Sequence, residues 1–206
     1  EFLSGGRIIF HAYPFSDEAL DKAIIRNKAK QDALFKPIGP LSGWSYDITK
    51  EGIITYRPER KYGYCYLFND ASCETIDMFS LGSSDNPDEL KLPARYLVDY
   101  FAEYLNYYSD CYRKLGFKKQ IWCCFSLAGI RGWQLGTDNR RHWSPRPIRT
   151  HRDSDFIFPE IIIPSIENGT LEPFRLIRSG FDELWQTFGY ERCFLYDESG
   201  SYVTGR

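Results

Sequence analysis

The chain of 206 residues lacks the short motifs by which common enzyme classes are recognised. It contains no Walker loop, no GxSxG elbow, no dinucleotide-binding glycine pattern and no HExxH sequence. The sequence therefore indicates no P-loop hydrolase, serine hydrolase, Rossmann-type dehydrogenase or HExxH metalloprotease. Histidine is scarce as well, so any histidine-dependent mechanism must use His11, His142 or His151.

The six cysteines lack the spacing of a zinc site, since there is no CxxC pair and no suitable Cys/His pattern. Cys123 and Cys124 are adjacent within an apolar run, where successive side chains of a strand point to opposite faces. The chain also has no signal peptide, no lipidation motif and no apolar run of about 20 residues. We expect reduced cysteines in a cytoplasmic protein without membrane contact, and we predict no cofactor and no metal site.

Neither charge sign is in excess, because 26 basic and 28 acidic residues give a net charge of −2. Global electrostatics will not draw the molecule to nucleic acid or to an anionic membrane, so any anion site must be local. The aromatic content of 17% is high and favours a β-rich body. A chain of this length buries roughly 70% of its unfolded surface, and we expect one domain over residues 1–206.

Hydrophobic patterning predicts the strands of a sheet. Apolar side chains follow one another between residues 121 and 127, which predicts a strand buried on both faces at the centre of a sheet. Tyr62, Tyr64 and Tyr66 alternate with smaller residues, which predicts a strand with one tyrosine face. Short connections predict antiparallel pairing of this strand with its neighbours. Further strands are expected at residues 7–13, 53–57, 73–79, 133–135 and 156–163, and a hairpin at 192–203.

Two helices are expected to cover the sheet. Pro93 stands where a first helical residue would be, and apolar side chains recur at spacings of three and four until Gly116 can end the helix. A C-terminal helix follows Pro173 and stops at Gly189, and a shorter helix is expected at residues 16–30. The predicted fold class is α+β: a mainly antiparallel sheet covered by one long helix and a C-terminal helix.

An arginine-rich segment is the best candidate for a binding site. Five arginines lie within residues 140–152, with Trp143 among them. The same range contains no Asp or Glu, and the next acid is Asp153. Guanidinium groups suit bidentate phosphate contacts, and an indole ring suits stacking. We predict contact with nucleic acid or a phosphate-bearing ligand through Arg131, Arg140, Arg141, Trp143, Arg146, Arg149 and Arg152. The alternative is a solvated loop whose arginines pair with acids elsewhere.

Two other functions stay open. A nuclease or phosphohydrolase would use His142 or His151 with Asp153 and Asp155. The latter two acids and Glu160 could hold Mg²⁺ only if a further carboxylate, such as Asp77, lay beside them. A purely structural oligomerisation domain would instead expose an aromatic face formed by Tyr62, Tyr64 and Tyr66.

The order of several short motifs carries a resemblance that covers nearly the whole chain. These motifs are IIFH before Pro14, YGYCYLFNDASCETID, LPARYLVDYFAEYL, FSLAGIRGWQL, FIFPEIII, and GFDELWQTFGYERC with the DESG turn. In this order they resemble the region that follows the Schlafen/AlbA-type DNA-binding domain in many bacterial proteins, which are often labelled ATP-binding or helix-turn-helix proteins.

The resemblance implies a C-terminal domain, or fragment, of a larger bacterial protein, with an N-terminal Schlafen/AlbA-type domain as its partner. Such proteins would act in anti-phage defence or stress response. The N-terminal domain of the wider family is linked to nucleic-acid binding, and in some members to RNA cleavage, but its carboxylates have no counterpart in this sequence. We therefore expect a non-catalytic sensing or binding module that passes a signal to that domain or helps it form homo-oligomers.

Overall fold

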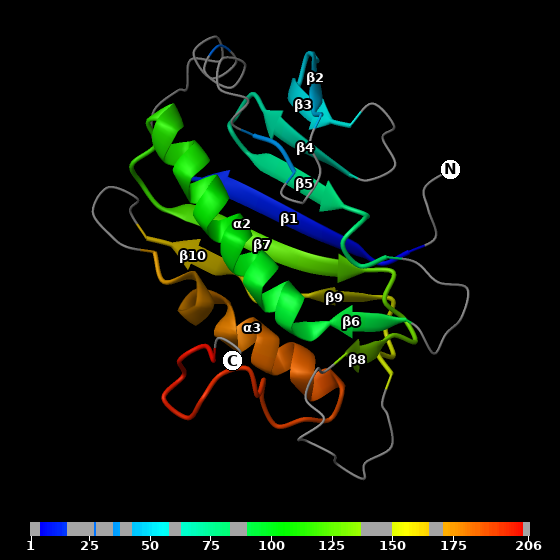
Figure 1. The fold of residues 1–206 in the computed structure, drawn as a ribbon. Coiled ribbons are helices and arrows are strands. Elements are labelled where there is room, and N and C mark those ends of the chain that lie inside the picture. Colours follow the sequence, from blue (N-terminus) through cyan, green and yellow to red (C-terminus); the bar gives the residue numbers. More distant parts are fainter. Residues whose placement is uncertain are drawn as a thin grey trace.

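The computed structural model describes residues 5–15, 27, 35–37, 43–57, 63–82, 90–136, 150–164 and 171–203. In this part of the chain a mainly antiparallel sheet lies behind two helices, one long and one C-terminal (Figure 1). The α+β prediction is therefore confirmed. The expected helix at residues 16–30 falls outside the described residues except for Asn27, and Tyr62 falls outside them as well.

The strands are β1 (Arg7–Pro14), β2 (Ser45–Ile48), β3 (Gly52–Tyr56), β4 (Gly63–Phe68), β5 (Cys73–Asp77), β6 (Lys91–Pro93), β7 (Ile121–Ala128), β8 (Gln134–Gly136), β9 (Asp155–Ile157) and β10 (Ile161–Ile163). The helices are α2 (Ala94–Leu115) and α3 (Pro173–Thr187).

The large sheet has the order β10-β7-β1-β5-β4-β3-β2, and β9 also pairs with β7. All of its pairings are antiparallel, which confirms the pairing predicted from the short connections. The strand expected at residues 156–163 is divided into β9 and β10 around Pro159, because proline cannot donate to the ladder. β6 and β8 form a separate parallel ribbon.

Helix α2 ends at Gly116, as the sequence predicts, but it begins at Ala94, because Pro93 is the last residue of β6 and not the first helical residue. Gly116 has a φ of 95°, a left-handed conformation that glycine adopts without a Cβ clash. Its backbone N–H donates to the carbonyls of Arg113 and Tyr112 and so satisfies orphan acceptors of the last turn.

The core is aromatic and joins both helices to the sheet. Phe101 of α2 stacks on Phe125 of β7, with ring centroids 4.1 Å apart and planes at 12°. The same ring contacts Phe158 and, on α3, Phe181. Most tyrosines of α2 are buried in this core, so they pack and do not form a stacking surface for bases.

Strand β7 corrects one prediction. Its residues alternate between buried and half-buried, so one face is fully buried and the other is only partly buried. The prediction of a strand buried on both faces is wrong, because apolar residues also occupy the half-buried face. The tyrosine face of β4 is confirmed, since Tyr64 and Tyr66 are half-buried while Cys65 and Leu67 are buried. Strands β2 and β6 were not predicted.

Candidate functional site

Most of the predicted arginine site lies outside the described residues: Arg140, Arg141, Trp143, Arg146 and Arg149. His142, which the alternative catalytic prediction named, lies outside them as well. The structure describes the residues on either side of this stretch, up to residue 136 and from residue 150 on. At these two ends Arg131 and Arg152 are both exposed.

Backbone hydrogen bonds tie the two ends of the segment together. The N–H of Gly132 donates to the carbonyl of His151 at 2.8 Å, and the N–H of His151 donates to the carbonyl of Trp133 at 2.8 Å. An isolated antiparallel bridge joins Gln134 to Thr150. The arginine-rich segment therefore starts and ends on one fixed base, which follows β7 in the chain and precedes β9.

His151 belongs to this base and is only 2% exposed. Its Nδ1 lies 2.9 Å from the backbone carbonyl oxygen of Asp153, and its ring lies against the rings of Phe156 and Phe188. A buried imidazole bonded to a backbone carbonyl orients the chain locally. This arrangement does not support the histidine as a general acid or base that reaches a substrate.

The nearby acids do not gather into a metal site. Asp153 and Glu160 are exposed, while Asp155 accepts a hydrogen bond from the N–H of Gly129 at 3.0 Å. Asp77 is buried, and its carboxylate accepts hydrogen bonds from Ser80 and Tyr100. In the described ranges no three His, Cys, Asp or Glu side chains form a group that could hold a metal ion.

The sheet face turned away from the helices forms a second candidate surface, which we call the open face. Every second residue on β1, β4, β5 and β7 is buried under the helices, whereas the residues between them are half-buried or exposed. Both described helices lie on the opposite side of the sheet (Figure 1). The open face includes Ile9, His11, Tyr13, Ile54, Tyr56, Tyr64, Tyr66, Phe68, Glu74, Ile76, Trp122 and Cys124.

Two pairs of aromatic rings occupy the open face, on either side of β5. Tyr13 of β1 and Trp122 of β7 are cross-strand partners, with ring centroids 5.5 Å apart. Tyr66 and Phe68 of β4 stack with centroids 4.4 Å apart and planes at 20°. Tyr13 is 45% exposed, so its ring is accessible to a flat ligand.

A hydrogen-bonded polar group lies on the same face, formed by His11, Glu74 and Tyr64. The Tyr64 hydroxyl donates to Glu74 Oε1 at 2.6 Å, and His11 Nε2 lies 3.0 Å from Glu74 Oε2. Burial and the hydrogen bond to Glu74 raise the pKa of the Tyr64 hydroxyl, which keeps it a donor. The side chains of His11 and Glu74 remain 32% and 30% exposed, so both reach solvent.

Cys124 pairs with His11, which in turn pairs with Glu74. A thiol, an imidazole and a carboxylate in one row are the residue types of cysteine-dependent catalysis. The Cys124 thiol, however, lies 3.6 Å from the carbonyl oxygen of Phe125 and 3.8 Å from that of Phe158, and burial raises its pKa. Because the thiolate is the reactive form, these contacts favour an unreactive thiol.

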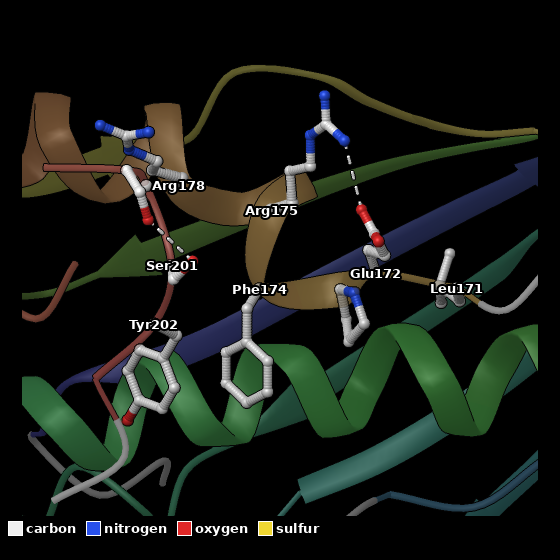
Figure 2. Close-up of a pocket in the computed structure, with 10 residues that line it drawn as sticks. Leu171, Glu172, Phe174, Arg175, Arg178, Ser201 and Tyr202 are labelled. Carbon is white, nitrogen blue, oxygen red and sulfur yellow. Dashed lines mark hydrogen bonds and ion pairs between the residues drawn. The ribbon is translucent and has the colours of Figure 1, made fainter. Parts of the chain in front are cut away.

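A pocket of about 840 Å³ lies between the start of α3 and the C-terminal turn (Figure 2). The rings of Phe174 and Tyr202 face each other in this pocket, with centroids 4.3 Å apart and planes at 6°. The Tyr202 hydroxyl donates to Asp99 at 2.6 Å, which ties the C-terminal turn to α2.

Two arginines line the same pocket, but each has an acidic partner. Arg175 Nη1 lies 3.3 Å from Glu172 Oε2, and Arg178 Nε lies 3.7 Å from Asp182 Oδ2 (Figure 2 shows the first pair). These carboxylates offset the positive charge that a phosphate would need. We therefore place the candidate site at the open face and the arginine-rich segment, not in this pocket.

Sequence reasoning assigned stacking to Trp143 and overlooked Tyr13, Trp122 and the His11–Glu74 pair. A signal was present, because alternate residues of β1 and β7 include histidine, tyrosine and tryptophan. Because β7 is apolar on both faces, its sequence does not show which face the helices cover.

Neither described helix is long and apolar enough to cross a membrane. Comparisons with protein-family models, with curated proteins and with solved structures found no match. The case for a function therefore depends on the geometry of the open face and of the base of the arginine-rich segment.

Proposed function

We propose that the chain is a non-catalytic binding module that contacts nucleic acid or another phosphate-bearing ligand through the arginine-rich segment. The observation that carries this proposal is the common base of that segment. Backbone hydrogen bonds between residues 132–133 and His151 hold its two ends together, and Arg131 and Arg152 are exposed beside them. A cluster of arginines on a fixed base can contact several phosphates at once.

The charge of the chain supports a local site. With a net charge of −2, the molecule has no general attraction for polyanions, so phosphate binding must come from the clustered arginines. Each neutralised phosphate releases counterions, which makes affinity fall as salt rises. Phosphate binding by this segment therefore has a measurable signature.

We further propose that the module works beside an N-terminal Schlafen/AlbA-type domain of a cytoplasmic bacterial protein that acts in antiviral defence. The motif order over nearly the whole chain supports this assignment. In that setting the module would recognise a ligand and the N-terminal domain would respond.

The test is binding of the 206-residue chain to labelled single-stranded RNA, single-stranded DNA and duplex DNA across a salt series. One variant changes Arg140, Arg141, Arg146 and Arg149 to Ala. A matched variant removes four exposed positive charges elsewhere, by changing Lys50, Lys91, Arg175 and Arg192 to Ala. Both variants have the same net charge, so they separate a local site from a general charge effect.

We expect wild type to bind with a steep salt dependence that the first variant loses and the matched variant keeps. For single strands, each lost phosphate contact lowers the slope of log K against log salt by about 0.7. Equal weakening by both variants would contradict a local site. If no protein binds while the mass shows a dimer, the open face with Tyr64 and Tyr66 is better explained as a surface for self-association.

A further inference from the structure

We infer that the open face is the interface of a homodimer, in which the sheets of two copies of this chain pack face to face about a two-fold axis. The inference goes beyond the proposed function and does not depend on the arginine-rich segment. It assigns a partner to the side of the sheet that the described helices leave free (Figure 1).

The open face differs in composition from a sheet face turned to water, which usually carries polar residues. Its middle holds aromatic and aliphatic side chains around His11 and Glu74. The register places further charged residues on the same side only at its margins: Arg7 begins β1, Asp155 begins β9, and Asp47 lies on the outer strand β2. An aromatic centre with charges at the rim is the usual anatomy of a protein interface.

An apolar row across three adjacent strands remains exposed in the single chain. The register pairs Tyr13 with Trp122, and Trp122 with Ile162 of β10, so the three side chains lie on the same side of the sheet. Tyr13 is 45% exposed and Ile162 is 52% exposed. Covering such a row with another apolar surface removes it from water and favours association.

The tyrosine hydroxyls of β3 and β4 on the open face already have partners within one chain. Tyr56 donates to Asp47 at 2.7 Å, and Tyr64 donates to Glu74 at 2.6 Å. The hydroxyl of Tyr66 is hydrogen-bonded to a threonine hydroxyl in the turn between β2 and β3. Burying a polar group is costly chiefly when it lacks a partner, so these hydroxyls can lose water at little cost.

The size of the open face suits a partner as large as the chain itself. At about 3.3 Å per residue and about 4.8 Å per strand, the strands of the large sheet present a flat area of about 650 Å². Projecting side chains raise the accessible area above this value. A stable interface buries about 800 Å² on each partner, so one sheet face of this kind, covered by another, is sufficient.

A second copy matches the open face in charge as well as in size. A two-fold interface uses the same patch twice, so the patch must complement itself. His11 and Glu74 place an imidazole and a carboxylate 3.0 Å apart. A two-fold axis beside this pair brings the imidazole of each copy toward the carboxylate of the other, whereas a partner of one charge sign leaves one of the two groups unmatched. Two twisted sheets pack in this way at about −30°.

The experiment measures the solution mass of the 206-residue chain from micromolar to near-millimolar concentration. It also measures the rate at which an alkylating reagent labels Cys124. This thiol is half-buried on the open face, whereas the other five cysteines are buried. Its labelling therefore reports whether this face is covered.

Two variants make the test specific to the open face. Tyr13→Asp puts a charge into the apolar row. Tyr96→Asp is the matched control, because Tyr96 is 38% exposed but lies on α2, on the opposite side of the sheet. Urea midpoints show whether each variant folds.

We expect a wild-type mass of twice the 24.1 kDa of the chain, and labelling of Cys124 that slows as the protein concentration rises. Tyr13→Asp raises the dissociation constant of the dimer by about thirtyfold or more, which is the effect of losing a central interface contact. Its Cys124 is labelled faster than that of wild type. Tyr96→Asp behaves as wild type does.

A wild-type chain that stays at 24.1 kDa over the whole concentration range overturns the inference. A dimer that folded Tyr13→Asp keeps, or that Tyr96→Asp loses equally, overturns it as well, because another surface then forms the dimer. If Tyr13→Asp does not fold, Ile162→Asp in the same row takes its place. If neither folds, wild-type labelling decides, and a rate that does not depend on concentration overturns the inference. None of these outcomes bears on the arginine-based proposal, which the oligonucleotide titrations test.

Discussion

His11 of β1 and Glu74 of β5 are cross-strand partners whose Nε2 and Oε2 atoms lie 3.0 Å apart. The same carboxylate accepts the hydroxyl of Tyr64 from β4, so three neighbouring strands contribute to one polar group. The group lies on a face that also carries aromatic and aliphatic side chains. It gives this face a fixed hydrogen-bonding centre.

Glu74→Gln is expected to lower the pKa of Tyr64. Burial is the largest cause of the raised pKa, and the hydrogen bond and negative charge of Glu74 add to it. Removing the charge of Glu74 takes away one of the causes that raise the pKa, so Tyr64 ionises at lower pH in the variant. Phenolate absorbance across a pH titration measures the pKa. Adding Tyr64→Phe to wild type and to Glu74→Gln identifies the part of the absorbance that comes from Tyr64. Identical titrations in the two backgrounds would contradict the proposed coupling.

The free energy of unfolding is expected to fall at alkaline pH. Burial raises the pKa of Tyr104, Tyr108 and Tyr112 well above the usual value, and raises that of Cys111 and Cys193 to about 12. A raised folded-state pKa gives stability that is complete below the unfolded pKa, about 8.5 for cysteine and about 10 for tyrosine. That stability declines as pH rises toward the folded values. A urea midpoint that stays constant from pH 8 to pH 11 would contradict this.

Phe101→Ala is expected to destabilise the protein by about 3–5 kcal/mol. The side chain is fully buried and touches both the sheet and α3, through Phe125 and Phe181, so its loss leaves a cavity where three elements meet. Urea unfolding followed by tryptophan fluorescence gives the difference. Ile157→Ala is the control, since Ile157 is 69% exposed and its loss should change stability by less than about 0.5 kcal/mol. Similar losses in both variants would show that this contact is not central to the core.

Gly63→Ala is expected to be more damaging than Gly82→Ala. Both glycines have positive φ, 134° and 69°, which strains any other residue. A Cβ on Gly63 would also lie 2.1 Å from the carbonyl oxygen of Ile76, whereas a Cβ on Gly82 meets nothing within 4 Å. We expect about 1–2 kcal/mol for the Gly82 variant and a clearly larger loss for the Gly63 variant. Equal losses would mean that β4 and β5 can separate to admit the methyl group.

Local signals explain why much of the fold was predictable. Pro93 and Gly116 bound the long helix by their own backbone preferences, and the short turn at Asn69 and Asp70 requires the antiparallel pairing of β4 and β5. These features depend on neighbours in the sequence. The parallel pairing of β6 with β8 depends on residues more than 40 positions apart, and no local pattern indicated it.

The candidate site was less predictable because it depends on distant contacts. The residues around His151 in the sequence are typical of a loop, but in the folded chain its ring packs against Phe156 and Phe188. Trp122 has an apolar sequence context, yet it lies on the half-buried side of β7 beside Tyr13. Which face of a sheet the helices cover cannot be inferred from a strand that is apolar on both faces.

The most direct test is photo-crosslinking of the 206-residue chain to a 12-nucleotide RNA that contains 4-thiouridine, followed by mass spectrometry of the crosslinked peptides. A binding module of the proposed kind gives crosslinks on peptides from residues 140–149. Crosslinks confined to α2 and α3, or none at RNA concentrations that saturate labelling of a control RNA-binding protein, would contradict binding through the arginine-rich segment.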